Sequence, residues 1–189
     1  MSFANELRPF SPAEVLKASG ETTVHRYGPS HPARILVENS LVTGPIFDWG
    51  CGHGYDLKYF RQHGLDCDGW DPVHRPETPP SEFLPDIFSW VHCAFVLNTL
   101  PCPRQRQKIL TDIYHFLPPS GHLSLTVRSQ AELASQIKSN WYKSGDGWIT
   151  SRGTFQRGFL ADELFEMLSP LYSSISVVSK KPIFVIAEK

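Results

Sequence analysis

Two carboxylates and a run of glycines in the first half of the chain have the chemistry to hold a small cationic molecule. The stretch Pro45–Gly54 reads P-I-F-D-W-G-C-G-H-G, an apolar run that contains the acid Asp48 and continues into three alternating glycines. Gly50 and Gly52 allow positive φ and let the backbone lie directly against a ligand. A carboxylate at Asp48 disfavours a phosphate and suits the cationic amino-acid end of a ligand.

The elements that position these residues follow from the pattern around them. Residues Pro45–Trp49 are predicted to form a buried strand, residues 50–54 a glycine turn that includes Cys51, and residues Tyr55–Gln62 a helix. Such a unit forms a ligand cradle at the carboxyl edge of a parallel sheet. The spacing G-x-G-x-G differs from the dinucleotide fingerprint and from the P-loop. A turn that only packs the helix on the strand is the alternative.

A second acid stands where a nucleoside-binding fold needs one. Residues Leu65–Asp71 are predicted to form a second strand that ends in Asp71, about 20 residues past the glycines. A carboxylate at this place accepts the hydroxyls of a ribose. Trp70 and Pro72 flank it and are predicted to wall an adenine. The alternative for Asp71-Pro72 is a simple turn initiator.

Composition restricts the class of protein. The chain has 189 residues, 41% of them hydrophobic, and a net charge of −1, which favours one compact domain and gives no overall attraction to nucleic acid. Four cysteines (Cys51, Cys67, Cys93 and Cys102) lack metal-ligand spacing, so we expect no metal site and reduced thiols in a cytoplasmic protein. No secretion signal or membrane-spanning run is evident.

The rest of the chain alternates helices and strands around this unit. We predict residues 1–44 to be an N-terminal helical segment that acts as a lid, and residues 45–189 to be the ligand-binding domain. The proline-rich residues 72–85 leave no room for a usual third strand. Further elements are expected as helices at Pro12–Ala18, Pro32–Asn39, Pro103–Phe116, 129–140 and Phe159–Leu168, and as strands at Asp86–Val96, His122–Val127, Ser174–Ser179 and Pro182–Ala187.

This order predicts an α/β, Rossmann-like sheet that ends in an antiparallel hairpin. The unit around Asp48 and the glycines resembles motif I of class I S-adenosylmethionine (SAM) methyltransferases. Four blocks, residues 47–56, 69–76, 86–98 and 145–157, resemble the methyltransferases associated with bacterial DNA phosphorothioation. The resemblance implies a SAM-dependent enzyme linked to DNA modification. Where those relatives carry an acidic stretch after Asn98, this chain has L-P-C-P.

Methyl transfer from a sulfonium is an in-line displacement, so the protein has mainly to position the reactants. SAM is expected to bind Asp48, Gly50, Cys51, Gly52, Trp70, Asp71 and Pro72. The acceptor, a small molecule or a nucleic acid, is expected at Arg128, Asp146, Phe155, Gln156 and Arg157. The catalytic candidates are His25, Tyr27 and Asn98, with His53 and His92 as further possible bases.

Other functions compete with this interpretation. The segment Asn98-Thr99-Leu100-Pro101 lacks the N-P-P-Y type of motif that amino-group DNA methyltransferases use, and Pro101-Cys102 matches the cytosine-C5 nucleophile only as a dipeptide. A non-catalytic SAM-binding accessory protein of a DNA-modification system is the main alternative, and a protein partner is compatible with it. A nucleotide-binding oxidoreductase is disfavoured by the glycine spacing.

Overall fold

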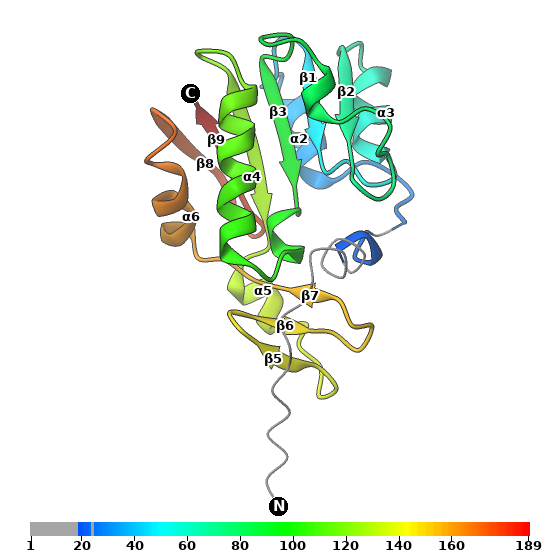
Figure 1. Cartoon of the computed structure of the whole chain (residues 1–189), viewed down its shortest axis with the longest axis vertical. Coiled ribbons are helices and arrows are strands. Elements are labelled where there is room, and N and C mark those ends of the chain that lie inside the picture. The colour runs from blue at the N-terminus through cyan, green and yellow to red at the C-terminus, as the bar shows by residue number, and fades with distance from the viewer. Residues whose placement is uncertain (1–18, 24) are drawn as a thin grey trace, which may run out of the picture.

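The computed structural model describes residues 19–23 and 25–189, so the predicted helix Pro12–Ala18 lies outside the described residues. A six-stranded sheet in the order β2-β1-β3-β4-β9-β8 forms the centre of the molecule (Figure 1). The first four are parallel neighbours and the last two join antiparallel. The strands are β1 (Ile46–Trp49), β2 (Cys67–Trp70), β3 (Trp90–Ala94), β4 (His122–Val127), β8 (Ser174–Lys180) and β9 (Ile183–Glu188).

Helices cover both faces of this sheet. Helices α2 (His31–Glu38) and α3 (Tyr55–Gln62) share one apolar cluster with β1, β2 and β3. Helices α4 (Pro103–Phe116) and α6 (Ala161–Leu168) pack in a second cluster on the other face. The helix prediction for residues 55–62 and 103–116 is confirmed to the residue. Since Ala33 and Leu36 of α2 are fully buried, this helix belongs to the core.

The connection between β2 and β3 is shortened, as the prolines predicted. Apart from the single 3-10 turn η1 (Pro80–Glu82), it holds no helix or strand. Strand β2 is therefore the edge strand on the parallel side of the sheet. The predicted α/β class with a C-terminal antiparallel hairpin is confirmed. A second 3-10 turn, η2 (Leu97–Thr99), follows β3 at the carboxyl edge of the sheet.

A small second sheet lies in residues 142–156, a region for which the sequence predicted no strands. Strands β5 (Tyr142–Ser144), β6 (Gly147–Ile149) and β7 (Phe155–Gln156) pair antiparallel below the carboxyl edge of the main sheet (Figure 1). The helix expected over 129–140 is only α5 (Gln130–Ala134), closed at its start by a capping box of Ser129 and Glu132. Short elements of this kind have weak patterns, because they bury few side chains.

Two further elements are shorter than the sequence predicted. The strand expected over Asp86–Val96 is limited to β3, because Asp86 and Phe95 have φ of 63° and 62°, a left-handed backbone that ends pairing. The helix expected over Phe159–Leu168 begins only at Ala161, and Phe165 within it is 54% exposed. Phe165 follows Leu164 by one residue, about 100° around α6, and so turns off the buried stripe.

Candidate functional site

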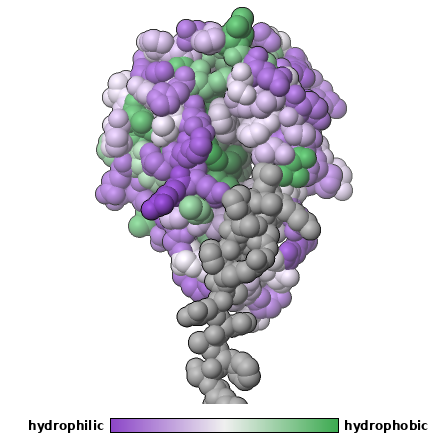
Figure 2. Space-filling model, in the orientation of Figure 1, coloured by the Kyte–Doolittle hydropathy of each residue, from purple (hydrophilic) through white to green (hydrophobic). Residues whose placement is uncertain are grey.

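The carboxyl ends of the parallel strands open into one cavity of about 1060 Å³. This volume lies at the upper end of the range for ligand pockets. Its wall comes from the glycine turn after β1, the end of β2, η2, α4 and residues 19–23. Figure 2 shows a hollow on this face where hydrophobic side chains lie between hydrophilic ones. The apolar part of the wall includes Trp49, Leu100, Ile109 and Phe116.

The glycine turn lines this cavity with bare backbone. Gly50 and Gly52 have φ of +76° and +54°, where side chains are disfavoured. A Cβ on Gly50 would collide with Val96, and one on Gly52 would come within 2.7 Å of Thr23. The turn is tied to β2, because the N–H groups of Gly50 and Cys51 donate to the Trp70 carbonyl at 2.8 and 3.1 Å.

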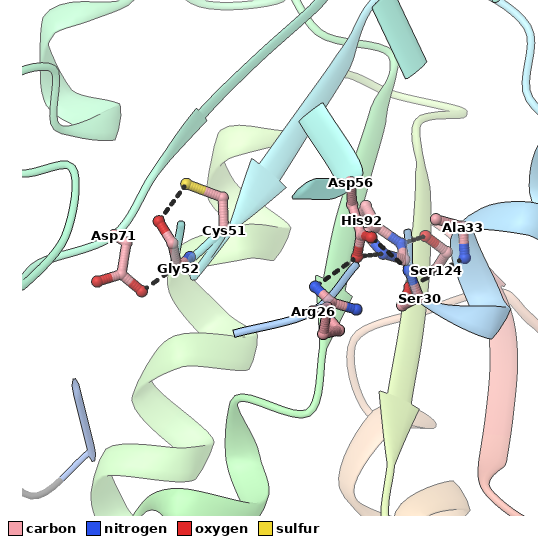
Figure 3. A network of polar contacts seen from close by, with 9 residues as sticks. All are labelled: Arg26, Ser30, Ala33, Cys51, Gly52, Asp56, Asp71, His92 and Ser124. Carbon is pink, nitrogen blue, oxygen red and sulfur yellow. Dashed lines mark hydrogen bonds and ion pairs between the residues drawn. The ribbon is translucent and has the colours of Figure 1, made fainter. Parts of the chain in front are cut away.

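Asp71 faces the same cavity from the end of β2. Asp71 is 8% exposed, and its carboxylate accepts the Gly52 N–H at 3.1 Å (Figure 3). It also accepts the N–H groups of Val73 and His74 at 2.9 Å each. A carboxylate offers about four acceptor positions. One position is therefore left for a ligand hydroxyl, while the other three hold together the two loops that form the cradle.

The other predicted cofactor residues divide into lining and supporting positions. Cys51, Trp70 and Pro72 line the cavity, and Trp70 meets Trp49 edge-on with ring centroids 6.2 Å apart. Burial and the Asp48 charge raise the pKa of the Cys51 thiol well above its usual range, so the thiol stays protonated. Asp48 lies behind the turn, 2% exposed and outside the cavity wall.

Asp48 is an acid without a full set of partners. Among the described residues, its Oδ2 atom is buried and has no hydrogen-bond partner. Burial, opposed by the nearby His92 and reinforced by Asp56, raises its pKa from 3.8 to about 7. Ionising Asp48 therefore lowers the stability of the fold. The stabilising contribution of the protonated carboxyl is complete below about pH 4 and is lost as pH rises through 7.

This linkage predicts that Asp48→Asn stabilises the fold in alkaline buffer. A pKa difference of this size corresponds to at most about 4 kcal/mol, and the buried amide of asparagine costs about 1–3 kcal/mol of it. The expected net gain is about 1–3 kcal/mol at pH 8, with no gain near pH 4. Urea denaturation at both pH values measures it. Equal differences at the two pH values would contradict the assignment.

A buried polar network lies on the α3 side of the turn (Figure 3). Asp56 of α3 accepts the Ser30 N–H at 2.6 Å and lies 3.4 Å from the Arg26 guanidinium and 3.6 Å from His92 Nε2. Burial opposes its ionisation, but His92, Arg26 and Ser30 outweigh this and lower its pKa to about 2. The network anchors the segment that carries Arg26, which lines the cavity.

The further base candidate His92 is in the wrong place for proton transfer to a substrate. It is fully buried, its Nδ1 lies 3.0 Å from the Ser124 hydroxyl, and it is not part of the cavity wall. The sequence placed it on a strand but gave no sign of which face of the sheet it would occupy. His92 is a structural member of the Asp56 network.

His25 and Tyr27 differ in their surroundings. The His25 ring stacks on His53 with centroids 4.1 Å apart, and its Nδ1 lies 3.4 Å from the Tyr55 hydroxyl. His53 and Tyr55 both line the cavity. Partial burial and the charges of His74 and His25 lower the pKa of His53, which favours its neutral form. Tyr27 is fully exposed and lies outside the cavity wall.

At the β3 and β4 end, three of the predicted residues meet in the cavity wall: Asn98, Arg128 and Gln156. The Asn98 amide donates to the Arg157 carbonyl at 2.6 Å, and its oxygen accepts the Arg128 N–H at 3.1 Å. Asn98 is 2% exposed, and these two bonds join η2 to the residues that follow β4 and β7. It holds the backbone of Arg128 directly and that of Gln156 through the adjacent Arg157.

Asp146, Phe155 and Arg157 lie outside the cavity wall. Asp146 pairs with Arg106 of α4 and lies 2.9 Å from Arg157 Nε, and Arg157 also pairs with Glu163. Phe155 is 2% exposed and packs under the small sheet. Arg106 looks like part of a solvated basic run in the sequence, yet it is 2% exposed and holds this network to the core.

Sequence patterns missed much of the wall. Ser19, Gly20 and Thr23, together with Phe95 and Ile109, come from segments with no ligand motif. Cys102 stands at the start of α4, outside the wall. Within residues 19–23 and 25–189, no group of three His, Cys, Asp or Glu side chains is placed to hold a metal ion, and no helix is both long and apolar enough to cross a membrane.

Comparison with known proteins decides the family. The model of a methyltransferase domain matches residues 22–164. This chain belongs to that family of methyltransferases. The match covers the glycine turn, Asp71 and both residues at the far end of the cavity, Arg128 and Gln156. Among curated proteins no match was found.

Solved structures share the fold of this methyltransferase. The 1,6-didemethyltoxoflavin N1-methyltransferase of Burkholderia thailandensis, with 1,6-didemethyltoxoflavin and S-adenosylhomocysteine (SAH) bound, is 20% identical, with a TM-score of 0.60 over 84% of this chain and 76% of that one. The sugar N-methyltransferase KedS8 of Streptoalloteichus sp. is 13% identical, with a TM-score of 0.62 over 92% and 87%. SAM-bound CalS10 of Micromonospora echinaspora, an amino pentose methyltransferase, is 13% identical, with a TM-score of 0.57 over 95% and 98%.

Proposed function

We propose that this methyltransferase transfers the methyl group of SAM to a small-molecule acceptor. The observation that carries the proposal is the bare glycine turn joined to the Asp71 carboxylate in the wall of one cavity, with Arg128 and Gln156 at its other end. The cavity has room for a cofactor and a small second molecule together.

The residues of the cradle fit SAM. Asp71 keeps one acceptor position for a ribose hydroxyl, Trp70 and Pro72 offer apolar surface to an adenine, and Gly50 and Gly52 leave space for the amino-acid part. Bound SAM supplies an electrophilic methyl group on a sulfonium. Asp48, behind the turn, gives a negative potential there once it is ionised.

The acceptor belongs at the other end of the cavity. The cofactor residues stand after β1 and β2, so the ends of β3 and β4 are left for the molecule that receives the methyl group. Arg128 and Gln156 would contact it, and Asn98 is hydrogen-bonded to the backbone of Arg128 and of Arg157, the residue after Gln156. The names of the solved neighbours include 1,6-didemethyltoxoflavin, an amino pentose and a sugar, which supports a small acceptor.

A base is needed only if the acceptor must lose a proton. Two residues of the N-terminal segment, His25 and Tyr27, are candidates for this base. His25 is better placed to act on a bound acceptor, because it stacks on His53 and lies close to the Tyr55 hydroxyl, and both of these residues line the cavity. Tyr27 makes no ring contact or hydrogen bond with His53 or Tyr55. We propose that the described residues 19–23 and 25–30 of the predicted lid hold His25 at the mouth of the cavity.

A link to DNA modification is a narrower proposal that rests on the four sequence blocks alone. Its physical support is weak, because the net charge is −1 and the cavity holds only one cation without a carboxylate partner among the described residues. A small acceptor taken from a DNA-modification pathway would satisfy both the resemblance and the geometry.

Calorimetric titration of the purified protein tests the proposal. SAM and SAH are expected to bind with micromolar dissociation constants and NADH is not. Transfer of radiolabelled methyl from SAM to small acids and amines, with duplex DNA as the alternative acceptor, then tests turnover; His25→Asn should lower it and Tyr27→Phe should not. Failure to bind SAM would overturn the proposed function, and labelling of DNA alone would overturn the small acceptor.

A further inference from the structure

The basic side chains of the cavity wall differ in whether a carboxylate lies next to them. Three basic side chains line the cavity: Arg26, Lys108 and Arg128. Arg26 lies 3.4 Å from the Asp56 carboxylate and Lys108 lies 2.7 Å from Asp112. Arg128 has no carboxylate within 4.0 Å among residues 19–23 and 25–189. It is the one cation in the described wall whose charge is not balanced by a neighbour.

Arg128 is also held firmly in place. Its N–H donates to Asn98, its carbonyl accepts the Phe159 N–H at 2.9 Å, and one guanidinium nitrogen donates to the neutral side chain of Gln136. The nearest influence from an acid comes from Glu132, whose carboxylate is already bound by the Ser129 N–H and hydroxyl at 2.8 and 2.7 Å. A guanidinium has five N–H donors, so most of its donors are left for a ligand.

Half-burial makes this unpaired charge costly. Burial lowers the pKa of Arg128 below its usual value, which reflects the loss of water around the guanidinium. Guanidinium groups stay protonated in proteins, so the charge persists. A fixed, partly desolvated fork of donors matches a carboxylate or a phosphate in shape as well as in charge.

The place of Arg128 assigns it to the acceptor and not to the cofactor. Asp71 ends β2 and Arg128 follows β4, and the order β2-β1-β3-β4 puts three strand spacings between them, roughly 14 Å. The cradle for SAM stands over β2 and β1. Arg26, anchored to Asp56 beside the glycine turn, is the cation nearer to the amino-acid end of the cofactor.

We infer that the acceptor of this methyltransferase carries an acidic group, a carboxylate or a phosphate, and that Arg128 is the residue that selects it. The inference rests on the proposed function, because it identifies the acceptor end of the cavity from the placement of SAM. Gln156, beside Arg128 in the wall, provides a neutral hydrogen-bonding contact to the same molecule.

Anion binding to the SAH-saturated protein tests the inference without knowledge of the acceptor. Inorganic phosphate and benzoate serve as probes, benzamide as the neutral isostere of benzoate, and chemical shift changes in ¹⁵N-labelled protein as the readout. Benzoate, phosphate or both should bind at millimolar concentration, and benzamide at least about tenfold more weakly. Arg128→Met should weaken anion binding at least about tenfold, and Arg128→Lys should weaken phosphate binding less.

The matched control is Arg104→Met, which removes the same charge from an exposed position of α4 outside the cavity wall and should leave anion binding unchanged. A cooperative urea unfolding transition near that of the wild type shows that each variant is folded, and SAM binding should stay within about twofold of the wild type. Equal anion binding by the wild type and Arg128→Met, or none by the wild type, would overturn the inference while SAM binding persists. Loss of SAM binding by folded Arg128→Met alone would assign Arg128 to the cofactor. Binding of a duplex oligonucleotide through Arg128, with no small anion bound, would also overturn it.

Discussion

Asp71→Ala is expected to weaken SAM binding by about 100-fold. The substitution removes the proposed acceptor for the ribose hydroxyl, and a hydrogen bond to a charged group contributes about 1.5–3 kcal/mol, or roughly 10- to 100-fold in affinity. It also strips the acceptor from the N–H groups of Gly52, Val73 and His74, which join the two loops of the cradle. Both losses act in the same direction, and isothermal titration with SAM and SAH measures their sum.

Asp68→Ala is the matched control for this variant. Asp68 lies on β2, three residues before Asp71, and has the same charge, but it is half-buried and outside the cavity wall. Its carboxylate accepts the Gly69 N–H at 2.8 Å and lies 3.7 Å from the Arg61 guanidinium. Its removal should change SAM affinity by less than about twofold. Asp71→Asn keeps one acceptor oxygen and should fall between wild type and Asp71→Ala. Unchanged SAM affinity in folded Asp71→Ala protein would refute the ribose assignment.

Asp146→Ala is expected to lower the free energy of unfolding by about 2–4 kcal/mol. The carboxylate pairs with Arg106 and Arg157, whose side chains are only 3% and 10% exposed. Removing one partner of a buried ion pair typically costs about 3–5 kcal/mol, because the remaining charge is left without compensation. The cost is reduced here, because Asp146 is 35% exposed and Arg157 keeps its contact with Glu163. Urea denaturation measures the loss.

The exposed pair of Lys108 and Asp112 provides the comparison. Lys108 is 73% exposed and the pair spans one helical turn of α4, so Asp112→Ala should cost less than about 0.5 kcal/mol. Asp146→Ala should also weaken acceptor binding more than SAM binding, because Arg157 is joined by its backbone to Asn98 at the acceptor end. Equal stability losses in the two alanine variants would show that the Asp146 network is solvated.

The sequence alone was informative about the cofactor end. The glycine turn, its strand and helix, and Asp71 are local features, encoded within a stretch of about thirty residues. Glycine at positive φ, a helix after a turn and an acid after a strand are each required by backbone geometry, so they leave a readable pattern. The shortened connection before β3 was equally readable, because proline excludes regular structure.

The acceptor end was decided by the tertiary structure. Arg128, Asp146, Gln156 and Arg157 all stand in polar stretches of similar composition, and no periodicity distinguishes a cation that faces a cavity from one that pairs with an acid. Arg106, far from Asp146 in the chain, takes up one carboxylate that the sequence assigned to substrate, and Asn98 joins three segments by two hydrogen bonds. Pairing of charges over such separations depends on how the small sheet packs against α4 and η2. Local patterns thus determined where we propose that SAM binds, whereas long-range packing left Arg128 without a carboxylate partner among residues 19–23 and 25–189 and so underlies the proposed acceptor site.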